Sequence, residues 1–281
     1  MSEKVKSIFL DNTTVHSDNI VDHDLTESWK TIFGDDNPNI NNDSLVAYWR
    51  LNDVTGADSS GNGHNITWTN SPTQTSETPF KNKNNTVLFN GTTNYGTVPD
   101  STDLSFGDGV TAQQFSISCW VKPNIDKTKA YFTILSKYAP GDATNPHEYS
   151  LHLYDNSIDG TASIIFRIFD NNIYSYVGAT LPDDFGITEN KWYSIVVTYD
   201  GTTESSGVDM YVDGVKQTNA TEAPSWFTYT ATGDTATNLT IGLGYKEDNF
   251  LNGELSELVI WNRELTSTEA KTLYDVKYGV V

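Results

Sequence analysis

The sequence is poor in the features that stabilise secreted chains or anchor membrane proteins. It has one cysteine, Cys119, so no internal disulfide can form among its 281 residues. No stretch stays apolar for long enough to cross a bilayer, which excludes membrane insertion. The run from Ser7 to Leu10 is too short for the hydrophobic region of a signal peptide. These absences predict a chain that is made in the cytoplasm and stabilised by packing.

Basic residues are also scarce, because 17 Lys and Arg stand against 37 Asp and Glu, for a formal net charge of −20. Such a charge repels phosphate backbones and excludes nucleic acid as a partner. The carboxylates suit an oxygen-ligated cation such as calcium, and they equally suit a solvated acidic surface without metal. The 7 Trp, 15 Tyr and 12 Phe supply enough apolar area for a substantial core.

Short segments that alternate apolar and polar residues recur from Ser44 onward, with turn residues between them. In FSISCWV, for example, Phe115, Ile117 and Cys119 share one face of an extended chain. At least nine strands are expected, in SLVAYWRL, TVLFNG, FSISCWV, EYSLHLYD, SIIFRIFD, KWYSIVVTYDG, VDMYVDGV, NLTIGLG and ELSELVIWN. The pattern predicts an all-β sandwich of antiparallel sheets.

Two local signals specify a turn and a helix. Asp213 and Gly214 lie between two strand-like segments and predict a type I′ hairpin, in which both residues need positive φ. Thr266 and Glu269 have the spacing of a capping box and predict one short helix at the C-terminus.

Residues 1–43 differ in composition from residues 44–281. They hold a short strand-like run, an amphipathic stretch over 25–33 and the linker-like run GDDNPNINND. The prediction is an N-terminal extension followed by one sandwich. The extension has two interpretations, either a docking segment that orders on another protein or a strap over its own sandwich.

Several motifs occur in a fixed order along the sandwich region. They are SLVAYWRLND with ADSSGNGHN, VLFNGTTNYGTVPDSTDLSF, FSISCWVKP, KWYSIVVTYDG, MYVDGVKQ and LNGELSELVIWNRELTSTEA. In this order the sequence resembles the laminin-G-like, concanavalin-A-like jelly-roll superfamily. The resemblance implies two stacked antiparallel sheets, with ligand sites on the concave sheet or its rim loops. This sandwich carries lectins, adhesive modules, glycosidases and viral surface proteins, so individual residues must decide the function.

Residues suited to catalysis are missing from the sequence. Glycosidases that resemble this fold carry a dense E-x-D-x-x-E string, which this sequence lacks. Glu254 and Glu257 are three residues apart, which predicts opposite faces of a strand. His147 and His152 are five apart and are expected on opposite faces too. We therefore expect no enzymatic activity.

The loop from Asp58 to His64 combines a carboxylate, an amide and two glycines, which predicts a calcium site led by Asp58 and Asn62. In resembling proteins this loop often meets the final strand at G-x-I-D-E-V, whose Asp helps to bind the ion. Ser256 replaces that Asp here, and Glu254 is the substitute on the same face. The predicted ligands are Asp58, Asn62, His64, Glu254 and Ser256. The alternative is a turn held by Asx hydrogen bonds without metal.

A glycan platform is predicted on the outward face of the strands, because sugars stack their C–H faces on exposed rings. The predicted residues are Trp120, His152, Tyr154, Arg167 and Phe169. The alternative is that Trp120 packs under a loop and that the extension covers Tyr154 and Phe169.

These inferences predict a non-catalytic surface recognition module that binds or decorates cell-surface or environmental glycans. The predicted location is the surface of a phage or virus particle, in a capsid, tail or fibre that the protein joins through residues 1–43. The alternatives are an extracellular or cell-surface bacterial adhesin or polysaccharide-binding module and, less favoured, a glycosidase.

Overall fold

The computed structural model describes residues 44–80, 85–126, 128–138, 147–155, 158–170, 175–183, 185–222, 228–244 and 249–275, and the backbone of 8–10 and 13–15. The chain forms two compact units, residues 1–42 and 43–281. In the first unit, β1 (Ile8–Leu10) and β2 (Thr13–Val15) pair as an antiparallel hairpin. The amphipathic stretch over 25–33 and the linker-like run lie outside the described residues.

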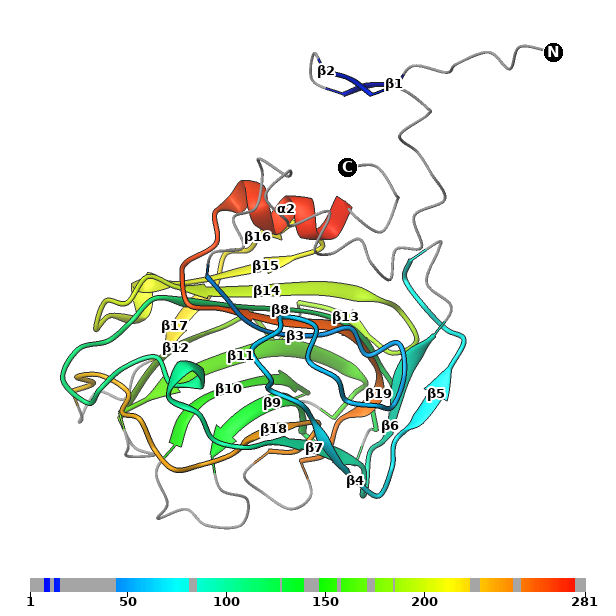
Figure 1. Ribbon diagram of the computed structural model, residues 1–281, viewed down its shortest axis with the longest axis horizontal. Helices are drawn as coiled ribbons and strands as arrows, with labels where there is room; N and C mark the ends of the chain where they lie inside the picture. The colour runs from blue at the N-terminus through cyan, green and yellow to red at the C-terminus, as the bar shows by residue number, and fades with distance from the viewer. Residues whose placement is uncertain are drawn as a thin grey trace. The chain divides into compact units, whose positions relative to one another are not determined.

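The second unit is a jelly-roll sandwich of two antiparallel sheets (Figure 1). The sheet that we call the front sheet has the order β17-β12-β11-β10-β9-β18-β7-β4, and β13 also pairs with β11. Its strands are β4 (Thr67–Thr69), β7 (Tyr95–Val98), β9 (Tyr131–Tyr138), β10 (His147–Tyr154), β11 (Thr161–Phe169), β12 (Tyr176–Thr180), β13 (Ile187–Thr188), β17 (Ala220–Glu222) and β18 (Leu239–Ile241).

The other sheet, the back sheet, has the order β16-β15-β14-β8-β19-β6-β5, and β3 also pairs with β19. Its strands are β3 (Leu45–Trp49), β5 (Thr73–Thr75), β6 (Thr86–Asn90), β8 (Phe115–Pro123), β14 (Tyr193–Tyr199), β15 (Val208–Val212), β16 (Val215–Lys216) and β19 (Asn252–Trp261). Two short 3-10 turns, η2 (Thr102–Leu104) and η3 (Ser205–Gly207), lie in the connections.

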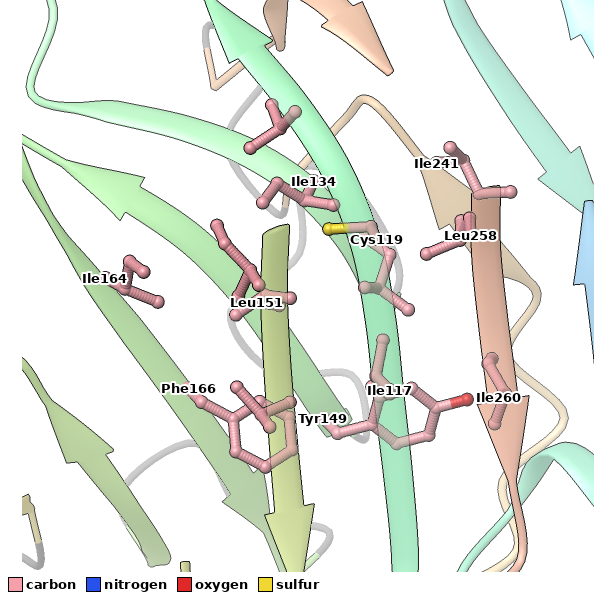
Figure 2. Packing of buried hydrophobic residues seen from close by; sticks show 14 of the residues in the cluster. Ile117, Cys119, Ile134, Tyr149, Leu151, Ile164, Phe166, Ile241, Leu258 and Ile260 are labelled. Atoms are coloured by element: carbon pink, nitrogen blue, oxygen red, sulfur yellow. The ribbon is translucent and has the colours of Figure 1, made fainter. Parts of the chain in front are cut away.

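The core lies between the inner faces of the two sheets. Figure 2 shows Ile117 and Cys119 of β8 among Leu151 of β10, Phe166 of β11 and other apolar side chains. Because burial raises the pKa of the Cys119 thiol, this side chain stays protonated and packs as a small apolar group. The alternation in the sequence therefore identified the inner face of β8 correctly.

The hairpin and the helix form as the sequence predicts. Asp213 and Gly214 have φ values of 51° and 75°, as a type I′ turn requires. Helix α2 (Ser267–Asp275) begins with the capping box, since the amide of Glu269 donates to Thr266 Oγ1 while the Glu269 carboxylate accepts from the Thr266 amide. Figure 1 shows α2 over β15 and β16 of the back sheet. No helix among the described residues is long and apolar enough to cross a membrane.

The sequence analysis did not predict strand β9, because apolar and polar residues do not alternate regularly along it. The register between β9 and β10 shifts between Leu151 and His152, which leaves Ile134 without a register partner. Ile134 and its neighbour Leu135 are both fully buried, so apolar and polar residues do not alternate there. A bulge of this kind inserts one extra residue and reverses the faces of the residues beyond it.

Candidate ligand-binding site

The outer face of the front sheet carries a patch of partly exposed polar and aromatic side chains. Leu151 of β10 and Phe166 of β11 face the core and lie opposite each other, so their sequence neighbours point outward. This register places four predicted platform residues on the outer face, as the sequence indicated: His152, Tyr154, Arg167 and Phe169.

Arg167 lies at the centre of this patch. Its Nε donates a 2.6 Å hydrogen bond to Glu222 Oε2, and its guanidinium carbon lies 5.1 Å from the ring centre of Tyr176. The two charged side chains lie on either side of Gly178, which pairs with both of them in the sheet. Burial opposes the charge of Arg167, but the hydrogen bond and the negative charge of Glu222 prevail and raise its pKa. Arg167 is therefore a permanent cation in this patch.

Two further tyrosines lie on the same outer face, four register positions along β10 from the residue opposite Arg167. Tyr131 of β9 and Tyr154 of β10 are register partners, their ring centres lie 4.6 Å apart, and both are partly exposed. Burial, Tyr131 and the Asp183 carboxylate raise the pKa of Tyr154, so its hydroxyl stays protonated at neutral pH. We define the tyrosine face as Tyr131, Tyr154, Arg167, Tyr176 and Glu222.

A buried layer supports the tyrosine face from beneath. His152 is 4% exposed, and its two ring nitrogens lie 2.9 Å from Thr133 Oγ1 and 3.1 Å from Tyr138 Oη. Burial, reinforced by the charge of Arg167, lowers the pKa of His152 to about 3, so the ring is neutral at physiological pH. Phe169 packs against Tyr138 and Tyr176. His152 and Phe169 are thus supporting residues rather than contact residues.

The prediction that His147 and His152 lie on opposite faces is wrong. Both rings contact Tyr138, because a register shift between His147 and Tyr149 changes the alternation of β10.

Two serine hydroxyls on this face, Ser150 and Ser163, are fully buried and form no hydrogen bond to any described residue. Ser150 is the register partner of Arg167, and Ser163 that of Tyr154. Buried hydroxyls without a partner destabilise a fold by about 1–3 kcal/mol each.

The sequence analysis missed Tyr131, Tyr176 and Glu222. Tyr131 belongs to the bulged strand, while Tyr176 and Glu222 lie on strands of five and three residues that carry little alternation. Tyrosines at both ends of YFTILSKY were a usable signal, but only the register shows that Tyr131 meets Tyr154.

Trp120 does not belong to this patch. It lies on the outer face of the back sheet, where it stacks on Tyr274 of α2 at 5.8 Å and meets Phe80 edge-on at 5.4 Å. It is 2% exposed. The grouping of Trp120 with His152 is therefore wrong, because alternation gives the face of a strand but not the sheet that the strand joins.

The Asp58 loop is held by hydrogen bonds that use both carboxylate oxygens. Oδ1 accepts from the amides of Tyr48 and Ser60, and Oδ2 accepts from the Ser60 hydroxyl and the His64 amide, all within 3.0 Å. A carboxylate has about four lone-pair positions, and four donors occupy them here. Asn62 directs its amide nitrogen at the carbonyls of Leu45 and Val46. This donor set does not fit a cation at Asp58 and matches the ion-free turn.

The other predicted ligands are engaged elsewhere. His64 Nε2 lies 2.9 Å from Asp103 Oδ2, and Glu254 Oε1 lies 3.4 Å from Lys122 Nζ. Ser256 is fully buried on β19 and is the register partner of Trp120.

The prediction that Glu254 and Glu257 point to opposite faces is also wrong. A register shift between Ser256 and Val259 places Glu257 at φ 50°, and its Oε2 accepts a 2.5 Å hydrogen bond from the Tyr48 hydroxyl on the outer face. Glu254 pairs with Lys122 on that same face. Glu257 is 3% exposed, and its carboxylate holds the Tyr48 hydroxyl.

Three carboxylates meet elsewhere, at Asp100, Glu148 and Asp234, the single such group of metal-binding side chains among the residues described. A lysine provides the cation here: Lys137 Nζ lies 2.8 Å from Asp100 Oδ1 and 2.5 Å from Glu148 Oε1. Lys137 and Glu148 are fully buried, and burial raises the pKa of Glu148 although Lys137 opposes this effect. The group is an ion cluster at one end of β9 and β10, with Lys137 and Glu148 buried and Asp234 exposed.

Comparison with known proteins identifies the family. A laminin-G family model, described as the concanavalin A-like lectin/glucanases superfamily, matches residues 90–271. The chain belongs to this superfamily. No curated protein sequence matches the chain.

Several solved structures share this sandwich at low sequence identity. Domain 4 of the arabinanase AbnA of Geobacillus stearothermophilus, solved with arabinotriose, is 18% identical with a TM-score of 0.55, covering 82% of this chain and 98% of that one. The binding domain of Paraclostridial mosquitocidal protein 1 is 16% identical with a TM-score of 0.58, covering 84% and 52%. Botulinum neurotoxin type C, whose cell entry depends on two ganglioside molecules, is 14% identical with a TM-score of 0.54, covering 84% and 51%. The chain thus spans about half of the toxin structures, and the likeness establishes the fold.

Proposed function

We propose that this protein is a non-catalytic glycan-binding module whose binding surface is the tyrosine face. The observation that carries the proposal is that three partly exposed tyrosines share the outer face of the front sheet with the Arg167–Glu222 pair. Aromatic rings offer flat apolar surfaces for the C–H faces of sugars, and the charged pair offers hydrogen bonds for hydroxyl groups.

Two of the similar solved structures support a carbohydrate ligand. One of them was solved with arabinotriose, and the cell entry of another depends on gangliosides. Neither identifies the glycan of this chain, because the fold is shared by proteins with different ligands.

The absence of catalysis is part of the proposal. Retaining glycosidases need two reachable carboxyl groups about 5 Å apart. Glu257 is buried against Tyr48, and Glu254 is paired with Lys122. In the group of Asp100, Glu148 and Asp234, the first two carboxylates are paired with Lys137. We expect no reducing ends to be released from a polysaccharide panel, and release that is lost in Glu254→Gln would refute this part.

Alanine substitution on the tyrosine face tests the binding site. Tyr154→Ala removes one ring of the Tyr131–Tyr154 pair and should weaken glycan binding about tenfold, since truncating an aromatic anchor typically loses 1–2 kcal/mol. The matched control is Tyr95→Ala, a partly exposed tyrosine on β7 of the same sheet, separated from β10 by β9 and β18. Equal affinities for wild type and Tyr154→Ala in calorimetry would place the site elsewhere.

Attachment to a virus or phage particle through residues 1–43 is the further part of the proposal, and a bacterial adhesin is its alternative. Deleting residues 1–43 should leave a folded sandwich that binds glycan but no longer joins its assembly. An unfolded product would show that the extension completes the fold.

A further inference from the structure

The ion pair at the centre of the tyrosine face has unused hydrogen-bonding groups on both partners. Arg167 donates through Nε to Glu222 Oε2, and neither its terminal nitrogens nor Glu222 Oε1 bonds to any described residue. The side chains of Arg167 and Glu222 are 25% and 19% exposed, so the pair is partly open to solvent. Four guanidinium hydrogens and one carboxylate oxygen therefore lie side by side, as donors and an acceptor.

The strand between the two residues keeps this opening free. Gly178 pairs with Arg167 on one side and with Glu222 on the other. A Cβ atom at Gly178 would lie 2.2 Å from the Phe166 carbonyl oxygen, so the sheet itself excludes a side chain there. The ion pair consequently spans a bare stretch of backbone, with Tyr176 at one side.

Charge determines which ligands suit this arrangement. Glu222 already neutralises Arg167, so the carboxylate of an acidic sugar would have to compete with it for the guanidinium. The acidic sugar would also approach Asp183, close enough to raise the pKa of Tyr154, and a chain with a net charge of −20. An uncharged sugar avoids both effects, because each hydroxyl can accept from Arg167 and donate to Glu222.

We infer that the tyrosine face selects uncharged glycans, with neighbouring hydroxyl groups of one sugar bridging Arg167 and Glu222. This inference rests on the proposed function and specifies its ligand class. Glu222 is then a specificity residue, since it excludes acidic sugars as well as binding neutral ones.

The experiment compares matched ligands by calorimetry on the full chain. A panel of neutral oligosaccharides, arabinotriose included, is titrated beside counterparts of the same length and linkage that carry a uronic acid. We expect wild type to bind at least one neutral member and its acidic counterpart about tenfold more weakly. The neutral affinity should barely change between low and high salt, because no net charge is screened.

Glu222→Gln keeps the size of the side chain and removes its charge, so it should narrow the ratio of neutral to acidic affinity several-fold. Asp209→Asn is the matched control: it removes the partner of Lys216, 2.6 Å away, in an ion pair on the back sheet, and should leave the ratio unchanged.

The outcomes separate this inference from the proposed function. Acidic ligands that bind wild type as well as neutral ones would overturn the inference and leave glycan binding intact. Equal ratios in Glu222→Gln and Asp209→Asn would overturn it too. Failure of every glycan to bind would refute the proposed function, and the inference with it.

Discussion

Replacing Asp58 with alanine separates the hydrogen-bonded turn from a calcium site. The substitution removes acceptors for the amides of Tyr48, Ser60 and His64 and for the Ser60 hydroxyl. Each hydrogen bond contributes about 0.5–1.5 kcal/mol, and water can replace those of the more exposed Ser60. We expect a loss of about 2–4 kcal/mol of unfolding free energy, which lowers the melting temperature by roughly 5–15 °C in a domain of this size.

Urea unfolding with an unchanged m-value measures this loss, and Asp53→Ala is the matched control. Asp53 accepts from the amide and the hydroxyl of Thr55 in an exposed turn of similar chemistry, so its loss should stay within about 0.5 kcal/mol. Chelation by EDTA should leave the wild-type melting temperature unchanged, because all lone-pair positions of Asp58 are already used. A chelator that destabilises wild type but not Asp58→Ala would refute this reasoning and restore the calcium site.

Three further substitutions test the buried polar groups. His152→Gln should reduce the loss of unfolding free energy between pH 6.5 and pH 3. The pKa of His152 is about 3 in the fold and 6.5 in the unfolded chain, so wild type loses up to about 1.4 kcal/mol per pH unit in this range. An equal slope of unfolding free energy against pH in wild type and variant would contradict this. Lys137→Met leaves the charges of Asp100 and Glu148 uncompensated and should lower the unfolding free energy by about 3–5 kcal/mol at pH 7 and by less in acid. A loss below about 1 kcal/mol in urea unfolding would show that Lys137 contributes no more than a surface ion pair does. Ser163→Ala removes an unpartnered buried hydroxyl and should stabilise by up to about 1 kcal/mol, and a lower melting temperature would show that this hydroxyl has a partner.

The strands that the sequence predicted are those in which alternation is unbroken. FSISCWV became β8 with its predicted inner face, and the Asp213-Gly214 turn and the Thr266 capping box formed as expected. The two errors about which face a residue occupies fall where one residue is inserted, between His147 and Tyr149 and between Ser256 and Val259. A rule of period two cannot detect a bulge, because the inserted residue leaves composition and spacing almost unchanged.

The candidate site was predictable only in part, for a related reason. Tyr154 and Arg167 were found because their own strands alternate, while Glu222 reaches Arg167 across an intervening strand. Such a contact depends on which strands are neighbours in the sheet. The pairing of strands far apart in sequence depends on the topology of the sheet, and the local sequence pattern of each strand does not predict it.

The outer faces of the two sheets differ in whether other parts of the chain cover their aromatic rings. Alternating strands place aromatic rings on the outside of both sheets, and Trp120 and Tyr154 are equivalent in this respect. On the back sheet, the C-terminal helix brings Tyr274 over Trp120, and the ring joins a second small core. On the front sheet, Tyr131, Tyr154 and Tyr176 retain access to solvent around a charged pair. Covering such rings with a ligand is favourable, and the adjacent ion pair can bond to hydroxyl groups, so this face meets the physical requirements of a sugar site. The back sheet at Trp120 does not, because Tyr274 and Phe80 of the same chain already pack against that ring.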